Sequence, residues 1–168
     1  METDATRLTV YTIGHSKHDW RAFLDLLRRH AIALVVDVRS QPYSRWSPQF
    51  NRESLARALD DAGLSYRFMG DVLGGRPADP ALYDPGQDRP NYARMAQLPA
   101  YQSGIEHLRD LARTERVAVM CAEGDHRHCH RHWLIAQTLL ARGVRVLHIQ
   151  PNGTTVSGES EPHQASLF

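Results

Sequence analysis

Residues 32–38 read IALVVDV, a run in which Asp37 is the only polar residue. A strand that is apolar on both faces is typical of a parallel sheet with helices on either side. Four other segments have a comparable strand pattern: 7–13, 64–69, 117–120 and 144–149. Amphipathic helix patterns separate most of these strands. The alternation predicts a single three-layer α/β domain over residues 7–149, with a mostly parallel sheet of about five strands in a Rossmann-like or flavodoxin-like arrangement.

Composition narrows the class of protein. The 168 residues suit one domain, and the formal net charge of +1 argues against binding to nucleic acid by bulk charge alone. No apolar run is long enough for a membrane span and no export signal precedes the first strand, so we expect a cytoplasmic protein without membrane contact. Lys17, the one lysine, lies in no phosphate-loop motif, which excludes Walker-type and Schiff-base chemistry.

Four segments follow the carboxyl ends of predicted strands, where ligands bind in open α/β sheets: 14–16, 37–40, 73–76 and 121–131. Each carries polar or thiol side chains, so we expect the four segments to form one site. The Gly-, Pro- and Asp-rich stretch 70–92 is interpreted either as a functional lid or as a disordered insertion. The polar residues 150–168 are expected to form a flexible tail.

The first two segments have features of an anion-binding site. Gly14 lets the backbone approach a ligand, and a helix beginning after Ser16 would direct amides at phosphate, although Ser16 alone is explained equally well as a helix cap. His15 is a candidate acid or base. A phosphate cradle is expected from arginine and serine side chains on two loops: Arg39, Ser40, Arg45 and Arg76.

Asp37 has two interpretations. It ends a strand of aliphatic residues, and a buried carboxylate needs a cationic partner. It is therefore either a catalytic carboxylate or one half of a structural pair with Arg39 or Arg45.

Residues 121–132 read CAEGDHRHCHRH, with four histidines and two cysteines. Such side chains bind divalent metals, and the candidate ligands are Cys121, His126, His128 and Cys129. The spacing matches no standard zinc pattern, so a solvated histidine-rich turn is the main alternative.

The same stretch offers a nucleophile. Cys121 and Arg127 are spaced as in cysteine phosphatases, and VVDVRS at 35–40 is similar to the aspartate–arginine strand of rhodanese-type sulfurtransferases. Against this, Glu123 and Asp125 within the loop would repel an anionic substrate. Cys129 is the second candidate, because a helix N-terminus would stabilise its thiolate.

Together these motifs resemble the domain-of-unknown-function family numbered 488. The resemblance rests on TIGHS (12–16), DVRS (37–40) with Pro42, Ser44 and Arg45, LGG (73–75), CAE (121–123) and CHR (129–131), and covers about residues 10–150. It implies one α/β domain but no reaction. It also implies one site made of the matched residues: His15, Ser16, Asp37, Arg39, Arg45, Glu123, Cys129, His130 and Arg131. The histidines at 126, 128 and 132 lie outside this pattern.

Three functions fit such a site. The preferred one is an enzyme that hydrolyses a phosphate of DNA or of a nucleotide, with a divalent metal as a candidate cofactor and with His130 and Arg131 among the phosphate ligands. The second is a cysteine enzyme of the sulfurtransferase or phosphatase kind. The third is a non-catalytic module that binds a nucleotide or nucleic acid. The catalytic candidates are His15, Asp37, Glu123 and Cys129.

The last five residues, QASLF, resemble the peptide by which bacterial proteins bind the sliding clamp. Leu167 and Phe168 would fill an apolar pocket of the clamp, and the amide of Gln164 would orient the peptide. The alternative is that Leu167 and Phe168 fold back on their own domain. The clamp interpretation is what favours DNA metabolism among the three functions.

Deletion of residues 164–168 is expected to abolish binding to a bacterial sliding clamp, because it removes both apolar anchors and the glutamine. The measurement is calorimetric titration of the clamp with the full chain and with the truncated chain. Failure of the full chain to bind at tens of micromolar would contradict the motif assignment.

Overall fold

The computed structural model describes residues 7–161 and contains a sheet of six strands in the order β3-β2-β4-β1-β5-β6. The first five strands are parallel, and β6 is antiparallel to β5. Their bounds are β1 Thr9–Gly14, β2 Leu34–Asp37, β3 Ser65–Phe68, β4 Val117–Cys121, β5 Arg145–Ile149 and β6 Thr155–Ser157. The five strands predicted from the sequence are therefore confirmed.

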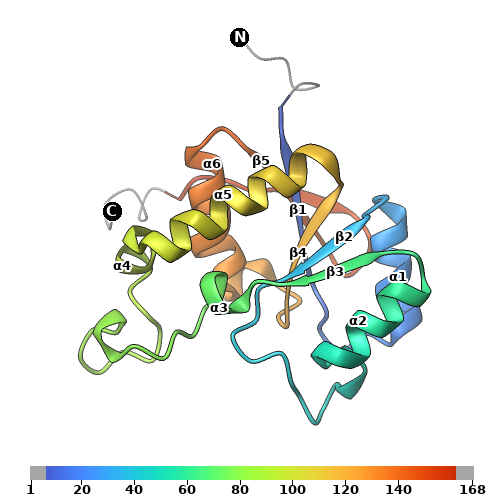
Figure 1. Cartoon of the computed structure of the whole chain (residues 1–168), viewed down its shortest axis with the longest axis horizontal. Coiled ribbons are helices and arrows are strands. Elements are labelled where there is room, and N and C mark those ends of the chain that lie inside the picture. Colours follow the sequence, from blue (N-terminus) through green and yellow to red (C-terminus); the bar gives the residue numbers. More distant parts are fainter. Residues whose placement is uncertain (1–6, 162–168) are drawn as a thin grey trace.

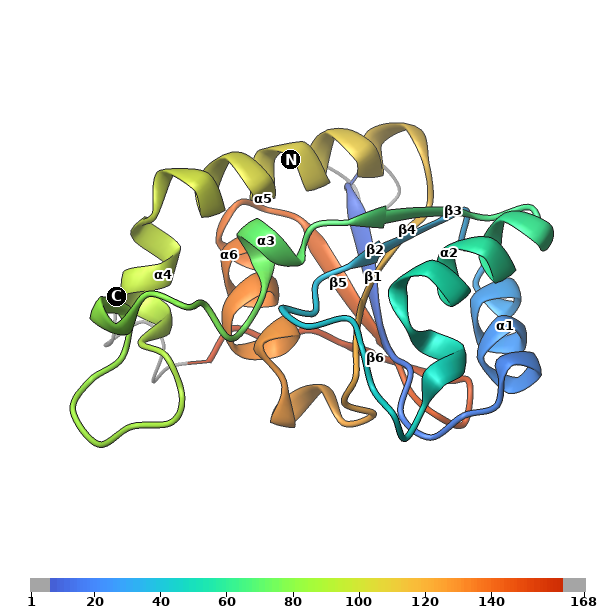
Figure 2. The same cartoon turned by 60° about the horizontal axis from the view of Figure 1, so that its bottom comes forward.

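Helices cover both faces of the sheet, as the two cartoon views show (Figures 1 and 2). One face carries α1 (Trp20–Arg29) and α2 (Arg52–Asp61), and the other carries α5 (Pro99–Thr114) and the helix that continues into α6 (Gln137–Ala141). That helix begins as a π-helix, η4 (Arg131–Ala136). Two short helices, α3 (Gly70–Leu73) and α4 (Tyr92–Gln97), flank the α5 face. No helix among residues 7–161 is long and apolar enough to span a membrane.

Alternation along β2 explains the two apolar cores. Val35 belongs to the cluster that contains the side chains of α1 and α2, including Phe23. Its neighbours Leu34 and Val36 belong to the opposite cluster, with Ile105 of α5. Since successive side chains of a strand point to opposite faces, a strand covered on both sides must be apolar throughout. The three-layer prediction is confirmed on this basis.

The strand order differs from both arrangements suggested by the sequence. A Rossmann sheet has the order 3-2-1-4-5-6 and a flavodoxin sheet 2-1-3-4-5, whereas here β4 lies between β2 and β1. Strand patterns predict that strands exist but do not determine which strands are neighbours. The insertion of β4 matters for the site, because it places Cys121 in the middle of the sheet edge.

Residues 150–161 are not the flexible tail that their composition predicts. Thr155–Ser157 forms β6, paired with Leu147–Ile149 of β5. Beyond it, the Glu161 amide donates to Gln137 Oε1 at 3.0 Å, and Gln137 Nε2 donates to the Glu159 carbonyl at 3.0 Å. Backbone pairing at a sheet edge does not require apolar side chains, so hydropathy could not detect it. The clamp-binding residues Gln164, Leu167 and Phe168 lie outside the described residues.

The segment after β1 is a tight turn rather than a helix N-terminus. Helix α1 begins at Trp20, and its cap is Asp19, whose Oδ1 accepts from the Ala22 amide at 2.8 Å. Ser16 instead has a φ of 48° and caps nothing. The prediction that the helix begins directly after Ser16 is therefore wrong.

Gly14 is required by close packing between backbones. A Cβ at this position would lie 1.7 Å from the Glu123 carbonyl oxygen. The next amides of the turn, those of His15 and Ser16, donate to the carbonyls of Cys121 and Ala122, each at 2.9 Å. The end of β1 thus fixes the loop that follows β4.

Gly14→Ala is expected to destabilise the fold by at least about 3 kcal/mol, because the Glu123 backbone would have to move. Gly63→Ala is the matched control. Nothing lies within 4 Å of its Cβ, and only its φ of +81° opposes the change, which costs about 1 kcal/mol. Urea unfolding of both variants measures the difference, and equal losses would contradict the packing role of Gly14.

Candidate functional site

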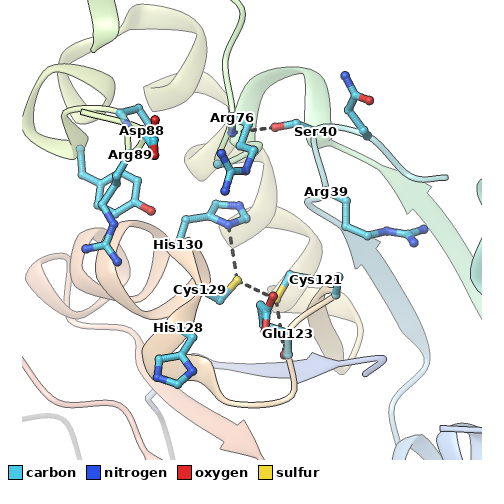
Figure 3. A pocket seen from close by; sticks show the side chains of 15 residues that line it. Arg39, Ser40, Arg76, Asp88, Arg89, Cys121, Glu123, His128, Cys129 and His130 are labelled. Carbon is cyan, nitrogen blue, oxygen red and sulfur yellow. Dashed lines mark hydrogen bonds between the residues drawn. The ribbon is translucent and has the colours of Figure 1, made fainter. Parts of the chain in front are cut away.

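An open cavity of about 380 Å³ lies at the carboxyl edge of the sheet (Figure 3). Its floor holds Cys121, at the end of β4, and Cys129, just before η4. Its walls come from the loop after β2 and from the long loop 74–91. The lining residues are Arg39, Ser40, Gln41, Gly75, Arg76, Asp88, Arg89, Pro90, Tyr92, Cys121, Ala122, Glu123, His128, Cys129 and His130. Three of the four predicted segments therefore meet here, and segment 14–16 does not line the cavity.

The two cysteines contact each other. Their sulfur atoms are 2.6 Å apart, both side chains are buried, and both are free thiols. Burial raises the pKa of Cys121, but the hydrogen bond from Cys129 and the positive charge of Arg131 outweigh it, so the net shift is downward. Burial and the adjacent Cys121 raise the pKa of Cys129. The pair thus loses its first proton more readily than an ordinary thiol and retains its second.

His130 is held in one tautomer beside this pair. Its Nε2 lies 3.1 Å from the Val38 carbonyl and 2.9 Å from the Leu73 carbonyl, and two acceptors require that Nε2 carry the proton. Nδ1 is therefore the unprotonated nitrogen, 3.5 Å from Cys129 Sγ. Burial lowers the pKa of His130 to about 4, so the ring stays neutral and can accept a thiol hydrogen bond.

The glycines of the LGG motif allow this packing. A Cβ on Gly75 would lie 2.6 Å from His130 Cγ, and one on Gly74 would lie 2.3 Å from Ser40 Oγ. Ser40 Oγ in turn accepts from the Arg76 amide at 2.8 Å. The motif serves to bring the loop close to His130.

Arg131 lies beneath the cavity and does not line it. It is fully buried, and its guanidinium donates to Thr12 Oγ1 at 2.7 Å and to the carbonyls of Glu123 and Gly124 at 2.9 and 3.0 Å. Its amide also donates to Cys129 Sγ at 3.5 Å. The prediction that Arg131 contacts a phosphate is therefore wrong, because its guanidinium does not face the cavity. Arg131 supports the loop and supplies positive charge next to the thiols.

Asp37 and Arg39 form the structural pair that the sequence left open. Arg39 Nε and Nη2 donate to the two Asp37 oxygens at 2.9 and 2.8 Å, and Tyr66 adds a hydroxyl at 2.6 Å. Both residues are buried, and Nη2 also donates to the Phe50 carbonyl. With its oxygens occupied, Asp37 has no place on the cavity wall. The positive charge of Arg39 is likewise neutralised by Asp37, although Arg39 borders the cavity.

The remaining phosphate-binding predictions divide between the cavity and the surface. Ser40 and Arg76 line the cavity, as does His130. Arg45 is exposed, with its guanidinium 4.9 Å from the ring of Trp46, and it lies on a different part of the loop. Gly14, His15 and Ser16 are also outside the cavity, because their backbone packs against the loop after β4.

His15 is buried apart from the cavity. Its Nδ1 donates to the Ser16 carbonyl at 2.9 Å, and its ring stacks on Phe50 with centroids 4.7 Å apart. Burial lowers its pKa to about 4, with the charge of Arg39 contributing in the same direction. His15 is therefore neutral in the fold and packs as an aromatic side chain.

The loop from Cys121 to Arg127 does not form the cradle of a cysteine phosphatase. Its carbonyls at Glu123 and Gly124 point inward to Arg131, and Cys121 Sγ contacts the Glu123 carbonyl at 3.7 Å. Amides directed at the sulfur are what a phosphate-binding cradle needs. Among residues 7–161, the backbone amide that donates to a thiol is that of Arg131, in the CHR motif, and its acceptor is Cys129 Sγ.

The four predicted metal ligands do not form one group, because Cys121 and Cys129 contact each other while His126 and His128 lie apart from them and from each other. The turn η3 (His126–His128) directs His126 inward and leaves His128 exposed, 4.0 Å from Asp125. Among residues 7–161, the group that could hold a metal is His126, His132 and His148. His148 lies in β5, far from the others in sequence, so spacing alone could not reveal it.

Sequence reasoning also missed part of the wall. Asp88, Arg89 and Tyr92 come from the long loop, where the only signal was its unusual length. Arg89 lies over the Tyr92 ring at 5.6 Å. Residues 70–92, interpreted from the sequence as a functional lid or a disordered insertion, contain α3 and a 3-10 turn (Pro80–Leu82) and contribute side chains to the cavity wall.

Comparison with known proteins identifies one match. The model of a family described as "Domain of unknown function DUF488" matches residues 19–138. No curated protein and no solved structure matches the chain. The matched region includes the Asp37–Arg39 pair and the CHR motif.

His15→Phe is expected to flatten the acid side of the stability profile. The unfolded chain binds a proton on His15 below about pH 6.5, whereas the folded state resists it down to about pH 4. Stability due to this neutral ring is thus complete above pH 6.5 and declines as the pH falls, by up to about 1.4 kcal/mol per unit. Unfolding at several pH values between 6.5 and 5 should show a shallower slope for the variant. Identical slopes would contradict a buried, neutral His15.

Proposed function

Because this chain belongs to the DUF488 family, which brings no activity with it, we propose its function from the site alone: a thiol-dependent enzyme that takes a sulfane sulfur from a small anion. The observation that carries the proposal is the contact between Cys121 and Cys129 at the floor of an open cavity. It corresponds to the second of the three functions that the sequence allowed, in its sulfurtransferase form.

The surroundings of the pair favour a thiolate. Arg131 is a fully buried cation, and among residues 7–161 no carboxylate forms an ion pair with it. A buried cation needs compensating negative charge. A thiolate shared by Cys121 and Cys129 provides it. Cys129 donates its one proton to Cys121 Sγ, and the neutral Nδ1 of His130, 3.5 Å from Cys129 Sγ, is the alternative acceptor for that proton.

Two adjacent thiols permit a balanced sequence. The thiolate attacks the outer sulfur of thiosulfate, the S–S bond of the donor breaks, and sulfite leaves with the bonding electrons. The enzyme then carries a persulfide. The second thiol can attack its inner sulfur, which expels hydrosulfide and closes a Cys121–Cys129 disulfide, and an external dithiol reduces that disulfide again. The thiol proton leaves with the hydrosulfide.

The charges of the wall favour a small anion over a long polyanion. Arg76 lines the cavity above His130, whose ring lies between Arg76 and the thiols in Figure 3. The exposed carboxylates of Asp88 and Glu123 border the same cavity and would repel a chain of phosphates. Positive charge is thus available for one anionic group near the sulfur atoms.

A nucleotide or DNA phosphate is the second candidate substrate. The specific observation in its favour is the pair of Arg89 and Tyr92, since arginine–aromatic pairs hold bases and phosphates. Glu123 would then be the available general base, and docking on the sliding clamp would bring the chain to sites of DNA repair. The same contacts would serve a module that binds without turnover.

Cys121→Ser and Cys129→Ser test the first proposal. The first turnover releases sulfite from thiosulfate. The substitution that removes the attacking sulfur should lower the rate of sulfite release by at least about 10³-fold. The substitution that removes the second thiol should leave the enzyme as a persulfide. The measurements are sulfite release and the mass of the intact protein.

Arg76→Gln should raise the KM for thiosulfate about tenfold. The matched control is Arg57→Gln, because Arg57 is an exposed arginine of α2.

Retention of full turnover by both serine variants would overturn the thiol mechanism. Hydrolysis of a nucleotide phosphate that survives alkylation of both cysteines would favour the second candidate. Binding of nucleotides without turnover by the wild-type chain would favour the non-catalytic module.

A further inference from the structure

Three buried histidines meet close to Arg131, whose Nη1 donates to Thr12 Oγ1, the atom 2.6 Å from His148 Nδ1. His126 comes from the turn η3, His132 from the π-helix η4 and His148 from β5. Their exposed fractions are 5%, 4% and 0%, and one ring nitrogen from each lies within 4.8 Å of the other two. Clustering of three imidazoles in an interior is costly unless a polar partner compensates, so the cluster requires an explanation.

The closest approach suits a metal ion. His132 Nδ1 and His148 Nε2 are 3.4 Å apart. Two imidazole nitrogens bound at about 2.0–2.1 Å to a tetrahedral zinc ion are about 3.4 Å from each other. The separation is long for a hydrogen bond between two neutral rings but fits a shared cation.

The outer nitrogens of these two rings have the partners that metal-binding histidines use. His132 Nε2 donates to Glu161 Oε1 at 2.9 Å, which leaves Nδ1 unprotonated and directed toward His148. His148 Nδ1 lies 2.6 Å from Thr12 Oγ1. The Glu161 carboxylate fixes the tautomer of His132 and makes its inner nitrogen a better ligand, and Thr12 Oγ1 can accept from His148 Nδ1 in the same way.

We propose that His126, His132 and His148 bind one divalent transition-metal ion, with zinc as the best match to three imidazoles. Three protein ligands are the set found in sites that retain a fourth position. The site uses His126 of the predicted metal ligands but none of the other three. It is independent of the proposed sulfur chemistry, because it shares no residue with the thiol cavity.

The charge and protonation of the cluster are compatible with a cation. The rings of His126 and His148 are buried, and the neutral form of imidazole is the one that binds metals. Arg131 and Arg127 are positive charges near the cluster that oppose metal entry, and the carboxylates of Glu161 and Asp125 oppose their effect. Gln150 completes the surroundings, 3.3 Å from His126 Nδ1.

His126 must turn to complete the site. Its ring stacks on that of His148, with centroids 4.0 Å apart and planes 10° apart, so their in-plane lone pairs run side by side. A rotation of His126 would direct its lone pair to the point between His132 and His148. His126 is itself buried, but it lies in a short turn whose other residues, Asp125, Arg127 and His128, are exposed.

A bound ion would connect four parts of the fold. These are β5, the π-helix, the turn after β4 and, through Glu161, the segment beyond β6. Each of the first three contributes one ligand, so metal binding should stabilise their arrangement. This role explains why a polar strand and a polar segment close the edge of the sheet beside the histidines.

Zinc binding to the full chain, freed of metal by a chelator, is the direct test. We expect one zinc ion per chain and a rise in the unfolding temperature. X-ray absorption should show imidazole ligands at about 2.0–2.1 Å, not sulfur at about 2.3 Å. The same measurement on a Cys121→Ser/Cys129→Ser chain separates this site from zinc held by the thiols. Sulfur ligation, or no binding with zinc in excess, would overturn the proposal.

Glu161→Gln tests the site without removing a ligand. Its side chain is 29% exposed, so the substitution should leave the fold intact while it weakens zinc binding, by about 10- to 100-fold. His132→Gln and His148→Gln should weaken it by at least about 100-fold. His128→Gln, an exposed histidine of the same turn, is the matched control and should bind zinc as the wild type does. Unchanged affinity in Glu161→Gln and in both ligand variants would overturn the proposal.

Discussion

The buried guanidinium of Arg131 organises the centre of this protein. It joins Thr12 of β1 to the carbonyls of the loop after β4, and its own amide reaches Cys129. Five N–H donors in a rigid fork suit this task, because several acceptors from different segments can be held by one planar group. Arg131 thus reaches both the thiols, through Cys129, and the histidine cluster, through the Thr12 hydroxyl that it shares with His148.

The position of Arg131 accounts for much of the local sequence. Cys129 precedes the π-helix, His130 is directed to the carbonyls of Val38 and Leu73, and Arg131 enters the core. Three consecutive side chains therefore have three different environments. Cys129 has an extended backbone, His130 has a helical one, and the π-helix, a feature frequent at functional sites, begins at Arg131. The CHR motif is thus an arrangement of one thiol, one neutral imidazole and one buried cation.

Polar residues of similar appearance in the sequence have different roles in the fold. Asp37 and Arg39 neutralise each other under the loop that carries Ser40, whereas Arg76 and Glu123 keep their charges at the cavity. His15 and His130 are both neutral, but only His130 faces a thiol. The difference is the partner within hydrogen-bond distance, and that partner always comes from another strand or loop.

The sequence by itself determined the three-layer α/β class, the five parallel strands and the edge at which the site lies. The apolar pattern of a strand or helix is a local property, so a segment such as IALVVDV indicates its own secondary structure without reference to the rest of the chain. It also predicted Cys129, His130, Ser40 and Arg76 as site residues on segments that follow strands, and these four line the cavity. Only the tertiary structure decided that β4 lies between β2 and β1 and that Asp37 forms an ion pair with Arg39. It also decided that His148 lies next to His126 and His132. Those outcomes depend on which strands and loops are neighbours in space, and a pairing between distant segments leaves no periodic trace in either of them.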